Sequence, residues 1–354
     1  MSTSIKSRFK HYPFLGFNTL ILTTFLVGCS NPPKVESVDG YAQGTTYKIL
    51  FWAEDAAPVS EVQSAFNATL AQIDKELSTY RPDSYISEFN RSPSLMWQSA
   101  STDFIQLIQI SKNIHLKSEG CYDPTIGPLF DLWGFNKDKL YVPTPKELVA
   151  LKAELGIDKV EVDEANLRIR KTLPSLQLDF SSMGEGYTIR KLSKVLEDKG
   201  FQNYMVQFGG DIKVKGRKPN ADQWRVAIRN PKPSKDGGPK IYQAITVTNK
   251  DGVTLNTSGT YNRYFDDNGV GYSYIINPST GKPVTHDLVS ASVFGSDPEI
   301  SDAWATTMLC LGPVKGAKIA KKENLDVFFI ERKNDKLVNA SSPGLLKTDK
   351  VKFD

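Results

Sequence analysis

Residues 178–187 read LDFSSMGEGY, from Leu178 to Tyr187, and lead from an apolar run through a turn of small residues into a helical pattern. The apolar run predicts a strand over Leu176–Phe180, and the pattern that follows predicts a helix over Gly184–Leu196. At such a junction, backbone groups can face a ligand. Because Gly184-Glu185-Gly186 lacks the third glycine of the dinucleotide-binding fingerprint, the segment does not indicate a Rossmann fold.

The rest of the chain mixes helices and strands, with no internal repeat and no clear linker. Apolar residues at helical spacing predict helices over Ser60–Leu77 and Ser101–His115. A capping box at Thr144-Pro145-Lys146-Glu147 opens a third helix that ends at Leu155. A further helix is predicted over Ser301–Leu311, and a solvated loop between Arg229 and Lys240. Short strands are predicted over Thr46–Phe51, Lys159–Val162, Tyr204–Phe208, Trp224–Ile228, Ala244–Val247 and Ser290–Phe294. A single α+β unit fits this order better than two domains.

The composition is that of an ordinary globular protein. The chain has 354 residues, 40% hydrophobic and 24% charged, which excludes a disordered, collagen-like or multi-span membrane protein. Its net charge is +4, and residues 1–28 hold three basic residues and no acid, so the remainder carries +1. Because proteins that follow phosphates concentrate positive charge on one face, we expect no nucleic-acid partner.

Residues 1–28 have the pattern of a lipoprotein-type signal peptide. Basic residues precede an apolar run from Phe14 to Val27, which is short for a membrane span. The run ends in Leu26-Val27-Gly28-Cys29, which resembles a bacterial lipobox, so we expect cleavage before Cys29 and lipidation of this cysteine. The alternative is an uncleaved anchor helix that ends in an incidental cysteine.

The expected mature protein is a lipid-anchored tether, residues 29–40, followed by a domain over residues 41–354. Prolines in Ser30–Ser37 oppose a helix, and several acyl chains would hold the protein on a membrane. Ser30, in place of Asp, resembles Gram-negative lipoproteins of the outer membrane. We therefore expect a protein of the bacterial cell envelope that faces the periplasm, with the outer membrane favoured over the inner.

The body of the chain holds two cysteines, Cys121 and Cys310. An extracytoplasmic setting permits a bridge between them, but the sequence cannot pair them. Two independent buried thiols are the simpler expectation. There is no metal-binding Cys–His spacing, and the mature chain has only His115 and His286, so no zinc site is expected.

Two further clusters offer groups suited to a ligand. Gly209-Gly210-Asp211 follows an apolar segment, and paired glycines let a backbone come close to a partner, although a tight turn explains them equally well. Asp302 and Thr306 stand four residues apart, so a carboxylate and a hydroxyl share one helix face. Such a pair suits Mg²⁺, which keeps water or phosphate oxygens in its other positions. The alternative is an acid placed to favour the helix dipole.

The common catalytic motifs are missing from the sequence. It contains no GxxxxGK[ST] loop, no HExxH pair and no GxSxG elbow. A Ser–His–Asp triad would have to use His115 or His286, and each is expected to be an ordinary surface or loop histidine.

Taken in order, the clusters resemble one family, the ApbE-type FAD:protein FMN transferases, which are often periplasmic lipoproteins. The similarity runs from Gly44 to Gly312, nearly the whole mature chain. Each block is weak by itself, and their shared order carries the resemblance. The blocks are Gly44–Tyr47, Ser78–Ser84, Asp123–Leu129 with Leu132–Phe135, Asp179–Tyr187, Phe208–Asp211, Thr257–Gly259 with Tyr261 and Arg263–Phe265, Ile275–Pro278 with Thr280–Pro283, and Ser301–Ala303 with Thr306.

The resemblance implies a single α+β unit around a flavin-nucleotide cleft, with FAD as substrate and Mg²⁺ as cofactor. Members pass the FMN half of FAD to a Thr or Ser hydroxyl of an acceptor protein and release AMP. By position, the implied metal ligands are the backbone carbonyl of Ser182 and the side chains of Asp302 and Thr306. The implied catalytic residues are Asp302 and Tyr274. The implied FAD contacts are Gln43, Tyr80, Cys121, Tyr122, Asp123, Asp179, Glu185, Gly209, Gly210, Ser258, Ile275 and Ala303, with Tyr80 stacked on an aromatic ring.

The chain departs from the family pattern at functional positions. Members commonly read His-Ile-Ile-Asp-Pro where this chain has Tyr274-Ile275-Ile276-Asn277-Pro278. The family histidine is thought to help deprotonate the acceptor hydroxyl, whereas tyrosine titrates near pH 10 and is a poor base at neutral pH. Gln43 replaces a frequent methionine, and Arg190 stands where many members carry Asp.

The sequence therefore predicts Mg²⁺-dependent transfer of FMN from FAD to a Thr or Ser of an extracytoplasmic respiratory or electron-transfer protein. Two other functions stay open. The same site could hydrolyse FAD to FMN and AMP, as some members of the family do. Alternatively, the protein could be a FAD-binding lipoprotein that has lost transfer, which Tyr274 and Asn277 motivate.

Overall fold

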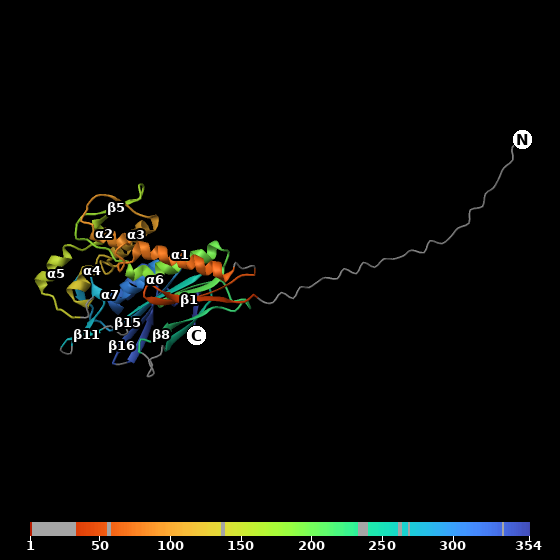
Figure 1. The fold of residues 1–354 in the computed structure, drawn as a ribbon. Helices are drawn as coiled ribbons and strands as arrows, with labels where there is room; N and C mark the ends of the chain where they lie inside the picture. Colours follow the sequence, from red (N-terminus) through yellow and green to blue (C-terminus); the bar gives the residue numbers. More distant parts are fainter. Residues whose placement is uncertain are drawn as a thin grey trace. The chain divides into compact units, whose positions relative to one another are not determined.

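An antiparallel sheet of eight strands forms the middle of the fold (Figure 1). This computed structural model describes Met1 and residues 33–54, 58–135, 139–232, 240–260, 264–267, 270–334 and 336–354. In sheet order the strands are β1 (Glu36–Ala42), β2 (Thr45–Trp52), β6 (Asn203–Phe208), β7 (Asp211–Lys215), β10 (Val253–Gly259), β15 (Leu288–Gly295), β16 (Asp326–Lys333) and β17 (Lys336–Ser341). Residues Pro33–Asp354 form one compact unit, and the predicted mixed α+β fold is confirmed.

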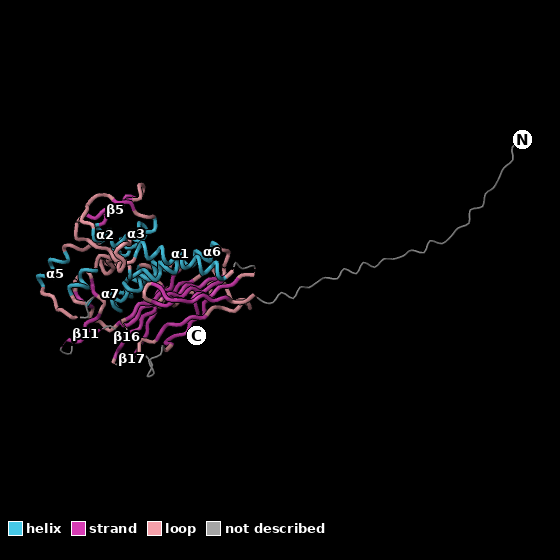
Figure 2. The backbone as a smooth tube through the Cα atoms, in the orientation of Figure 1, coloured by secondary structure: helices cyan, strands magenta, loops and turns pink. Residues whose placement is uncertain are grey.

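Long helices cover one face of this sheet (Figure 2). They are α1 (Val59–Leu77), α6 (Ser181–Asp198) and α7 (Pro298–Lys322). The helical spacing predicted for α1 is confirmed, because Phe66 and Leu70 are buried against Ile49 and Phe51 of β2. Each such side chain contributes about 1.5–3 kcal/mol when fully buried. The apolar stripe of α1 is therefore what holds it on the sheet.

A small second sheet packs on the opposite face. It consists of β8 (Arg225–Arg229), β9 (Ile241–Val247) and β18 (Val351–Phe353). Val226 and Ile245 from this sheet share a core with Leu255 and Phe328 of the large sheet. The large sheet is thus buried on both faces, by helices on one and by strands on the other.

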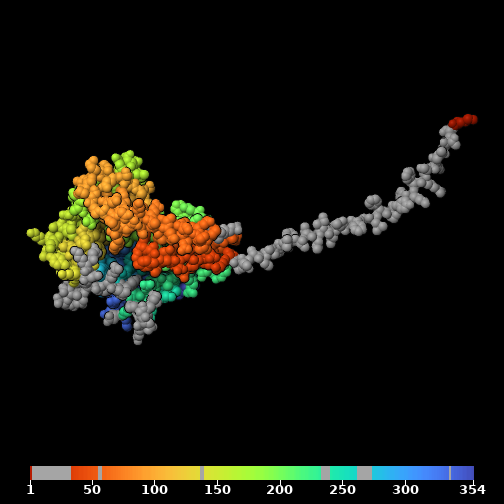
Figure 3. Space-filling view, in the orientation of Figure 1, coloured from red at the N-terminus to blue at the C-terminus, as the bar shows by residue number. Residues whose placement is uncertain are grey.

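The remaining elements build a lobe at one end of the helical layer. Figure 3 shows the surface of residues 58–117 (orange) between that of β1 and β2 (red) and that of residues 127–152 (yellow). The elements of the lobe are α2 (Tyr85–Arg91), β3 (Gln98–Ser99), α3 (Thr102–Lys117), α4 (Gly127–Leu132), α5 (Pro145–Lys152), the 3₁₀ turn Ile157–Lys159, β4 (Val160–Asp163) and β5 (Arg168–Lys171). Two short hairpins, β11 (Tyr264–Asp267) with β12 (Val270–Ser273) and β13 (Ile276–Asn277) with β14 (Lys282–Pro283), complete the chain.

The predicted strand over Leu176–Phe180 is wrong. The segment is extended, but a side chain takes the place of a neighbouring strand: Asn90 accepts from the N–H of Leu178 over 2.8 Å and donates to its carbonyl over 2.8 Å. The N–H of Asp179 donates to the carbonyl of Pro124 over 2.8 Å. An apolar run predicts that a segment is buried. Burial alone does not distinguish a strand from an extended segment that side chains hold in place.

Two helix predictions differ from the structure mainly at their ends. Helix α6 starts at Ser181, before the predicted Gly184, and α7 starts at Pro298, before the predicted Ser301. Gly312 has the non-helical angles φ 72° and ψ 177°, so the first part of α7 ends at the predicted Leu311 and a second helical part follows the kink. The capping box at Thr144 is confirmed, since Glu147 and Thr144 bond each other's backbone N–H groups, but the helix it opens ends at Lys152 and not at the predicted Leu155.

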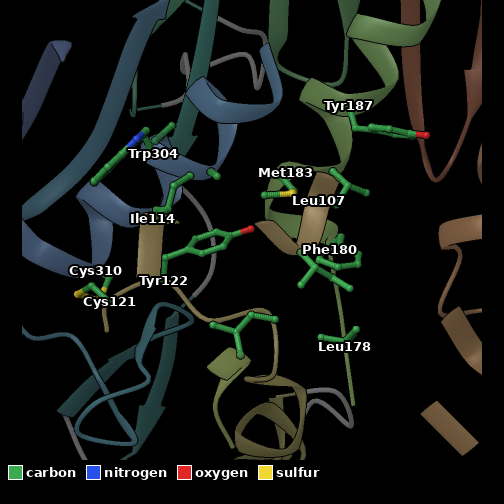
Figure 4. Packing of buried hydrophobic residues seen from close by; sticks show 14 of the residues in the cluster. Leu107, Ile114, Cys121, Tyr122, Leu178, Phe180, Met183, Tyr187, Trp304 and Cys310 are labelled. Carbon is green, nitrogen blue, oxygen red and sulfur yellow. A yellow bond between two sulfur atoms is a disulfide. The ribbon is translucent and has the colours of Figure 1, made fainter. Parts of the chain in front are cut away.

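Cys121 and Cys310 form a disulfide with their Cα atoms 5.8 Å apart. The expectation of two independent thiols is therefore wrong. The cysteines are 189 residues apart in the chain, and both belong to the apolar core between α3, α6 and α7 (Figure 4). Only the packing of this core brings them together, which is why the sequence could not pair them.

The proposed signal peptide and Cys29 lie outside the described residues, as does most of the predicted loop, residues 233–239. Within the described ranges, no helix is both long and apolar enough to cross a bilayer.

Candidate functional site

Some of the residues implied to contact FAD line a cleft at the start of α6. A cavity of about 670 Å³ is lined by the β1–β2 turn, the end of α1, the loop that follows it and the first turn of α6. Gln43, Tyr80, Asp179 and Glu185 all line this cavity. Four of the predicted contacts thus come together from segments that are far apart in the chain.

A second cavity of about 660 Å³ lies next to the first and shares Thr79, Tyr80 and Asp179 with it. Its other walls come from α2 and from Gly127 at the start of α4. Tyr80 is 98% exposed, so its ring is open to a ligand on either side. The cleft therefore has two compartments with an available aromatic ring between them, which suits a ligand with two planar halves.

Gln43, which the sequence analysis expects to contact FAD, lies in the β1–β2 turn. Gln43 and Gly44 have positive φ angles of 51° and 78°. The hydroxyl of the buried Thr188 donates to Oε1 of Gln43 over 2.9 Å. This bond orients the amide so that its NH₂ group remains available to the cleft.

Three carboxylates interact with one another beside the cleft, and one of them lines it. They belong to Glu185 on α6, Asp211 at the start of β7 and Asp302 on α7, and the two aspartates are 2% and 7% exposed. Burial and the neighbouring Asp211 raise the pKa of Asp302 well above its ordinary value. Burial and the nearby Glu185 likewise raise the pKa of Asp211. Like charges held this close, away from water, favour a cation or a proton among them.

Each carboxylate is held by backbone or side-chain donors. The N–H of Gly186 donates to Oδ2 of Asp302 over 2.9 Å, and the N–H of Gly210 donates to Glu185 over 3.1 Å. Asp211 accepts from the N–H of Thr257 over 2.8 Å and from the amide of Asn256 over 2.6 Å. The cluster is therefore fixed in place before any ligand binds.

The glycines beside this cluster are required by close contacts. A Cβ at Gly209, where φ is 60°, would lie 2.0 Å from Oε1 of Glu185. A Cβ at Gly186 would lie 2.2 Å from the carbonyl oxygen of Pro298, so α6 and α7 touch backbone to backbone. The alternative of a tight turn fits the Gly209-Gly210 pair, which joins β6 to β7, and the close neighbour at Gly209 is Glu185.

The residues implied to bind Mg²⁺ offer oxygen donors of the right kind. Asp302 and Thr306 lie one turn apart on α7, and the Thr306 hydroxyl is 2.9 Å from that of Ser258 on β10. In a regular helix the Gly186 N–H would point at the carbonyl of Ser182, and here it donates to Asp302. Hard oxygen donors next to excess negative charge fit Mg²⁺. Among the described residues, no group of three or more His, Cys, Asp or Glu forms a metal cluster, so water or phosphate oxygens would have to complete the coordination.

Tyr122 connects this metal region to the loop after α3. Its hydroxyl accepts a hydrogen bond from Oγ of Ser182 over 3.1 Å, and burial raises its pKa above the ordinary value. Cys121, the preceding residue, is held in the disulfide to α7. Asp123 turns away from the cleft, since it accepts from Thr125 over 2.7 Å and lies 3.4 Å from His115 beside a separate cavity of about 460 Å³.

Tyr274 lies in a different environment from the carboxylate cluster. Its ring is 4.8 Å from that of Phe135, in an apolar cluster with Trp133 and Ile276. Ile275 packs against the core between α3 and α7, and Ala303 is fully buried. The sequence placed these residues among the FAD contacts or catalytic groups. In the structure Tyr274 and Ile275 pack in apolar surroundings, and Ala303 follows Asp302 on α7.

Sequence reasoning missed several residues that build the site. Asp211 was part of a matching block, but no pattern revealed its burial beside Glu185 and Asp302. Arg190, noted only as a departure, pairs with Asp103 over 3.0 Å and with the fully buried Glu299. The presence of Arg190 where many family members carry Asp is the signal that could have indicated such an ion pair. Tyr261 and Arg263 lie outside the described residues.

The fold and the site define a class: a mixed α+β protein with a two-compartment cleft beside a buried carboxylate cluster. The ApbE family model matches residues 43–329. The FAD:protein FMN transferase of Salmonella typhimurium is 33% identical over 329 residues, which are 90% of this chain and 92% of that protein.

Solved structures agree with the sequence match. The flavin transferase ApbE from Vibrio cholerae superposes with a TM-score of 0.78 at 30% identity, over 89% of this chain and 99% of that one. The apo form of the flavinyl transferase ApbE from Pseudomonas stutzeri gives 0.78 at 31% identity, over 88% and 96%. The chain belongs to the ApbE family.

Proposed function

We propose that this protein transfers FMN from FAD to a Thr or Ser hydroxyl of an acceptor protein, releases AMP and requires Mg²⁺. It is a flavin transferase, as are the relatives that match most of its length. The observation that carries the proposal is the contact of Asp302, one turn from Thr306 on α7, with the N–H of Gly186, the residue that follows Glu185 in the lining of the cleft.

Different residues of the cleft bind different parts of FAD. The exposed ring of Tyr80 stacks on one planar half of FAD, and the Gln43 amide offers its NH₂ group to a ring acceptor. The backbone carbonyl of Ser182 and the side chains of Asp302 and Thr306 would hold Mg²⁺. When bound, the metal neutralises charge that develops on the phosphates as the pyrophosphate bond breaks. The buried carboxylates keep this end of the cleft selective for a cation.

The reaction is a displacement at phosphorus. The acceptor oxygen forms a bond to the phosphorus of the FMN half, and the bond from that phosphorus to the bridging oxygen breaks. AMP leaves with the bridging oxygen, and the hydroxyl proton is lost to a base. Since Tyr274 is a poor base at neutral pH, the proton passes to solvent or to a leaving phosphate oxygen, and transfer is slow.

A second candidate function is binding of FAD without transfer. Tyr274 at the position of the family histidine is the observation that favours it, together with the apolar packing of its ring against Phe135. Under this alternative, the cleft and the metal ligands stay intact, and turnover is absent.

We also propose that the enzyme is anchored by lipid at Cys29 and faces the periplasm, where its acceptor is a respiratory or electron-transfer protein. The lipobox-like Leu26-Val27-Gly28-Cys29 supports the anchor. Replacing Cys29 with Ser and following the protein between membrane and soluble fractions tests it. Wild type is expected in membranes and the variant outside them after signal removal.

The activity is tested with residues 30–354, FAD and Mg²⁺, with and without an acceptor domain. Transfer predicts covalent flavin on the acceptor and AMP in its presence only. AMP without acceptor indicates hydrolysis. Tight FAD binding with neither product indicates the binding function.

A further inference from the structure

The disulfide ends on the same helix face as the candidate metal ligands. Asp302, Thr306 and Cys310 follow one another at intervals of four residues on α7. Residues with this spacing lie above one another on a helix. The bond from Cys310 to Cys121 therefore fixes a second segment against the stripe of α7 that carries Asp302.

The segment that carries Cys121 also contacts the start of α6, through the side chain of Tyr122. Figure 4 shows the bonded cysteines at one side and the Tyr122 ring reaching from them toward Met183 on α6. The Tyr122 hydroxyl accepts from Oγ of Ser182 over 3.1 Å. Four residues on, the N–H of Gly186 donates to Asp302 over 2.9 Å. These contacts close a ring, which we call the site ring, made of Asp302, Cys310, Cys121, Tyr122, Ser182 and Gly186.

Only one contact between the segments of this ring is covalent. The two hydrogen bonds can exchange with water when the segments separate. The disulfide cannot, so it keeps the Cys121–Tyr122 segment on α7 and holds the Tyr122 hydroxyl within reach of Ser182 on α6.

We propose that the Cys121–Cys310 disulfide is a positioning bond of the transfer site, which holds Tyr122 and Ser182 at a fixed spacing from Asp302 and Thr306. The inference rests on the proposed function for its effect on FAD. A dithiol that breaks the bond passes two electrons and two protons to the cysteines and becomes a disulfide itself. Reduction thus loosens the metal ligands without removing any of them.

The first test compares the oxidised protein with the Cys121→Ala/Cys310→Ala double variant, without ligand and well below the unfolding temperature. Hydrogen exchange is measured on peptides from residues 181–190. We expect exchange in this segment to become about tenfold faster, since a lost constraint raises the open population. Ile228→Ala, in the remote core of the small sheet, is the control for general destabilisation and leaves this segment unchanged.

The second test measures FAD binding by flavin fluorescence, with and without Mg²⁺. The half-saturating FAD concentration with Mg²⁺ is expected to rise about tenfold in the double variant and not in Ile228→Ala, because small displacements of ligating groups are costly. Wild type reduced with a dithiol should give the same rise in the half-saturating FAD concentration, and reoxidation should reverse it. If the double variant does not fold, this reduction experiment tests the positioning role of the disulfide.

The outcomes distinguish the positioning role of the disulfide from the proposed function of the protein. Unchanged exchange and unchanged FAD binding in the double variant, or changes equal to those of Ile228→Ala, overturn the positioning role. Failure of the oxidised wild type to bind FAD at all overturns the proposed function, while the exchange result still decides whether the disulfide orders the start of α6.

Discussion

The backbone N–H of Gly186 donates a hydrogen bond to Oδ2 of Asp302 over 2.9 Å, across 116 residues of sequence. It joins the second turns of α6 and α7, two helices that both carry candidate metal ligands. The helices can come this close because Gly186 has no side chain: a Cβ there would lie 2.2 Å from the carbonyl oxygen of Pro298. The site therefore depends on a helix crossing as much as on its charged residues.

Replacing Gly186 with Ala should separate α6 from α7. The new Cβ meets backbone that cannot rotate away, so we expect a loss of about 1–3 kcal/mol in the free energy of unfolding and weaker FAD binding. Denaturant unfolding and flavin fluorescence measure the two effects. Gly184→Ala is the matched control for stability alone, since Gly184 lines the cleft: a Cβ there has nothing within 4 Å and should keep or raise stability. Equal effects of the two substitutions on the free energy of unfolding would contradict the proposed crossing.

Asp302→Asn should abolish transfer without unfolding the protein. The amide oxygen can still accept from Gly186, but one negative charge is lost from the metal site, so we expect transfer to fall at least about 10²-fold. Because burial and Asp211 raise the pKa of Asp302, the neutral amide should not lower the stability of the metal-free protein.

The control for Asp302→Asn lies on the same helix. Asp297 caps α7 by accepting from the N–H of Ile300 over 3.1 Å, and Asn is an equally good cap. Asp297→Asn should therefore keep both stability and transfer. Transfer at the wild-type rate in Asp302→Asn would show that this carboxylate is not a metal ligand.

Tyr274→His should increase the rate of transfer. A positioned base with a pKa near neutrality typically contributes 10²–10⁴-fold, and we expect the lower end, about 10²-fold, because the Tyr274 ring packs 4.8 Å from Phe135. The measurement is the initial rate of flavin attachment at pH 7. If FAD binding is unchanged and the rate does not increase, the base is not what limits this enzyme.

The stability of the α6–α7 contact should depend on pH through Glu299. Burial raises the pKa of Glu299 to about 7, against the opposing charge of Arg190. Since the folded pKa lies above the ordinary value of 4.5, the stabilising contribution is complete below pH 4.5 and is lost as the pH rises through 7. The loss is about 3 kcal/mol at most.

Glu299→Gln removes this titration. The difference in unfolding free energy between variant and wild type should therefore shift in favour of the variant from pH 5 to pH 8. Urea unfolding at both pH values measures it. A difference that does not change with pH would mean that Glu299 stays charged throughout, in its ion pair with Arg190.

Much of the fold follows from local patterns in the sequence. The stripe of Phe66 and Leu70, the capping box at Thr144 and the burial of β15 each come from a few neighbouring residues. Leu176–Phe180 was misassigned because its partners are the side chain of Asn90 and the carbonyl of Pro124, which no local pattern reveals. The Cys121–Cys310 bond was missed for the same reason, since only the core between α3, α6 and α7 brings the two together.

The candidate site was predictable where residue order carried it. The family resemblance predicted that Gln43, Tyr80, Asp179 and Glu185 contact the same ligand. In the structure all four line one cavity. The resemblance did not show the burial of Asp211 between charged neighbours or the helix contact at Gly186. Both depend on distances between segments, which only the folded chain defines.

The most direct test is transfer itself. Residues 30–354 are incubated with FAD, Mg²⁺ and an acceptor domain, and the acceptor is examined by mass spectrometry for added FMN while AMP is measured in the same sample. We predict an acceptor heavier by one FMN, with one AMP released per FMN attached and neither product when Asp302→Asn replaces wild type. An unmodified acceptor under conditions where a relative with the family histidine labels it would contradict the proposed function.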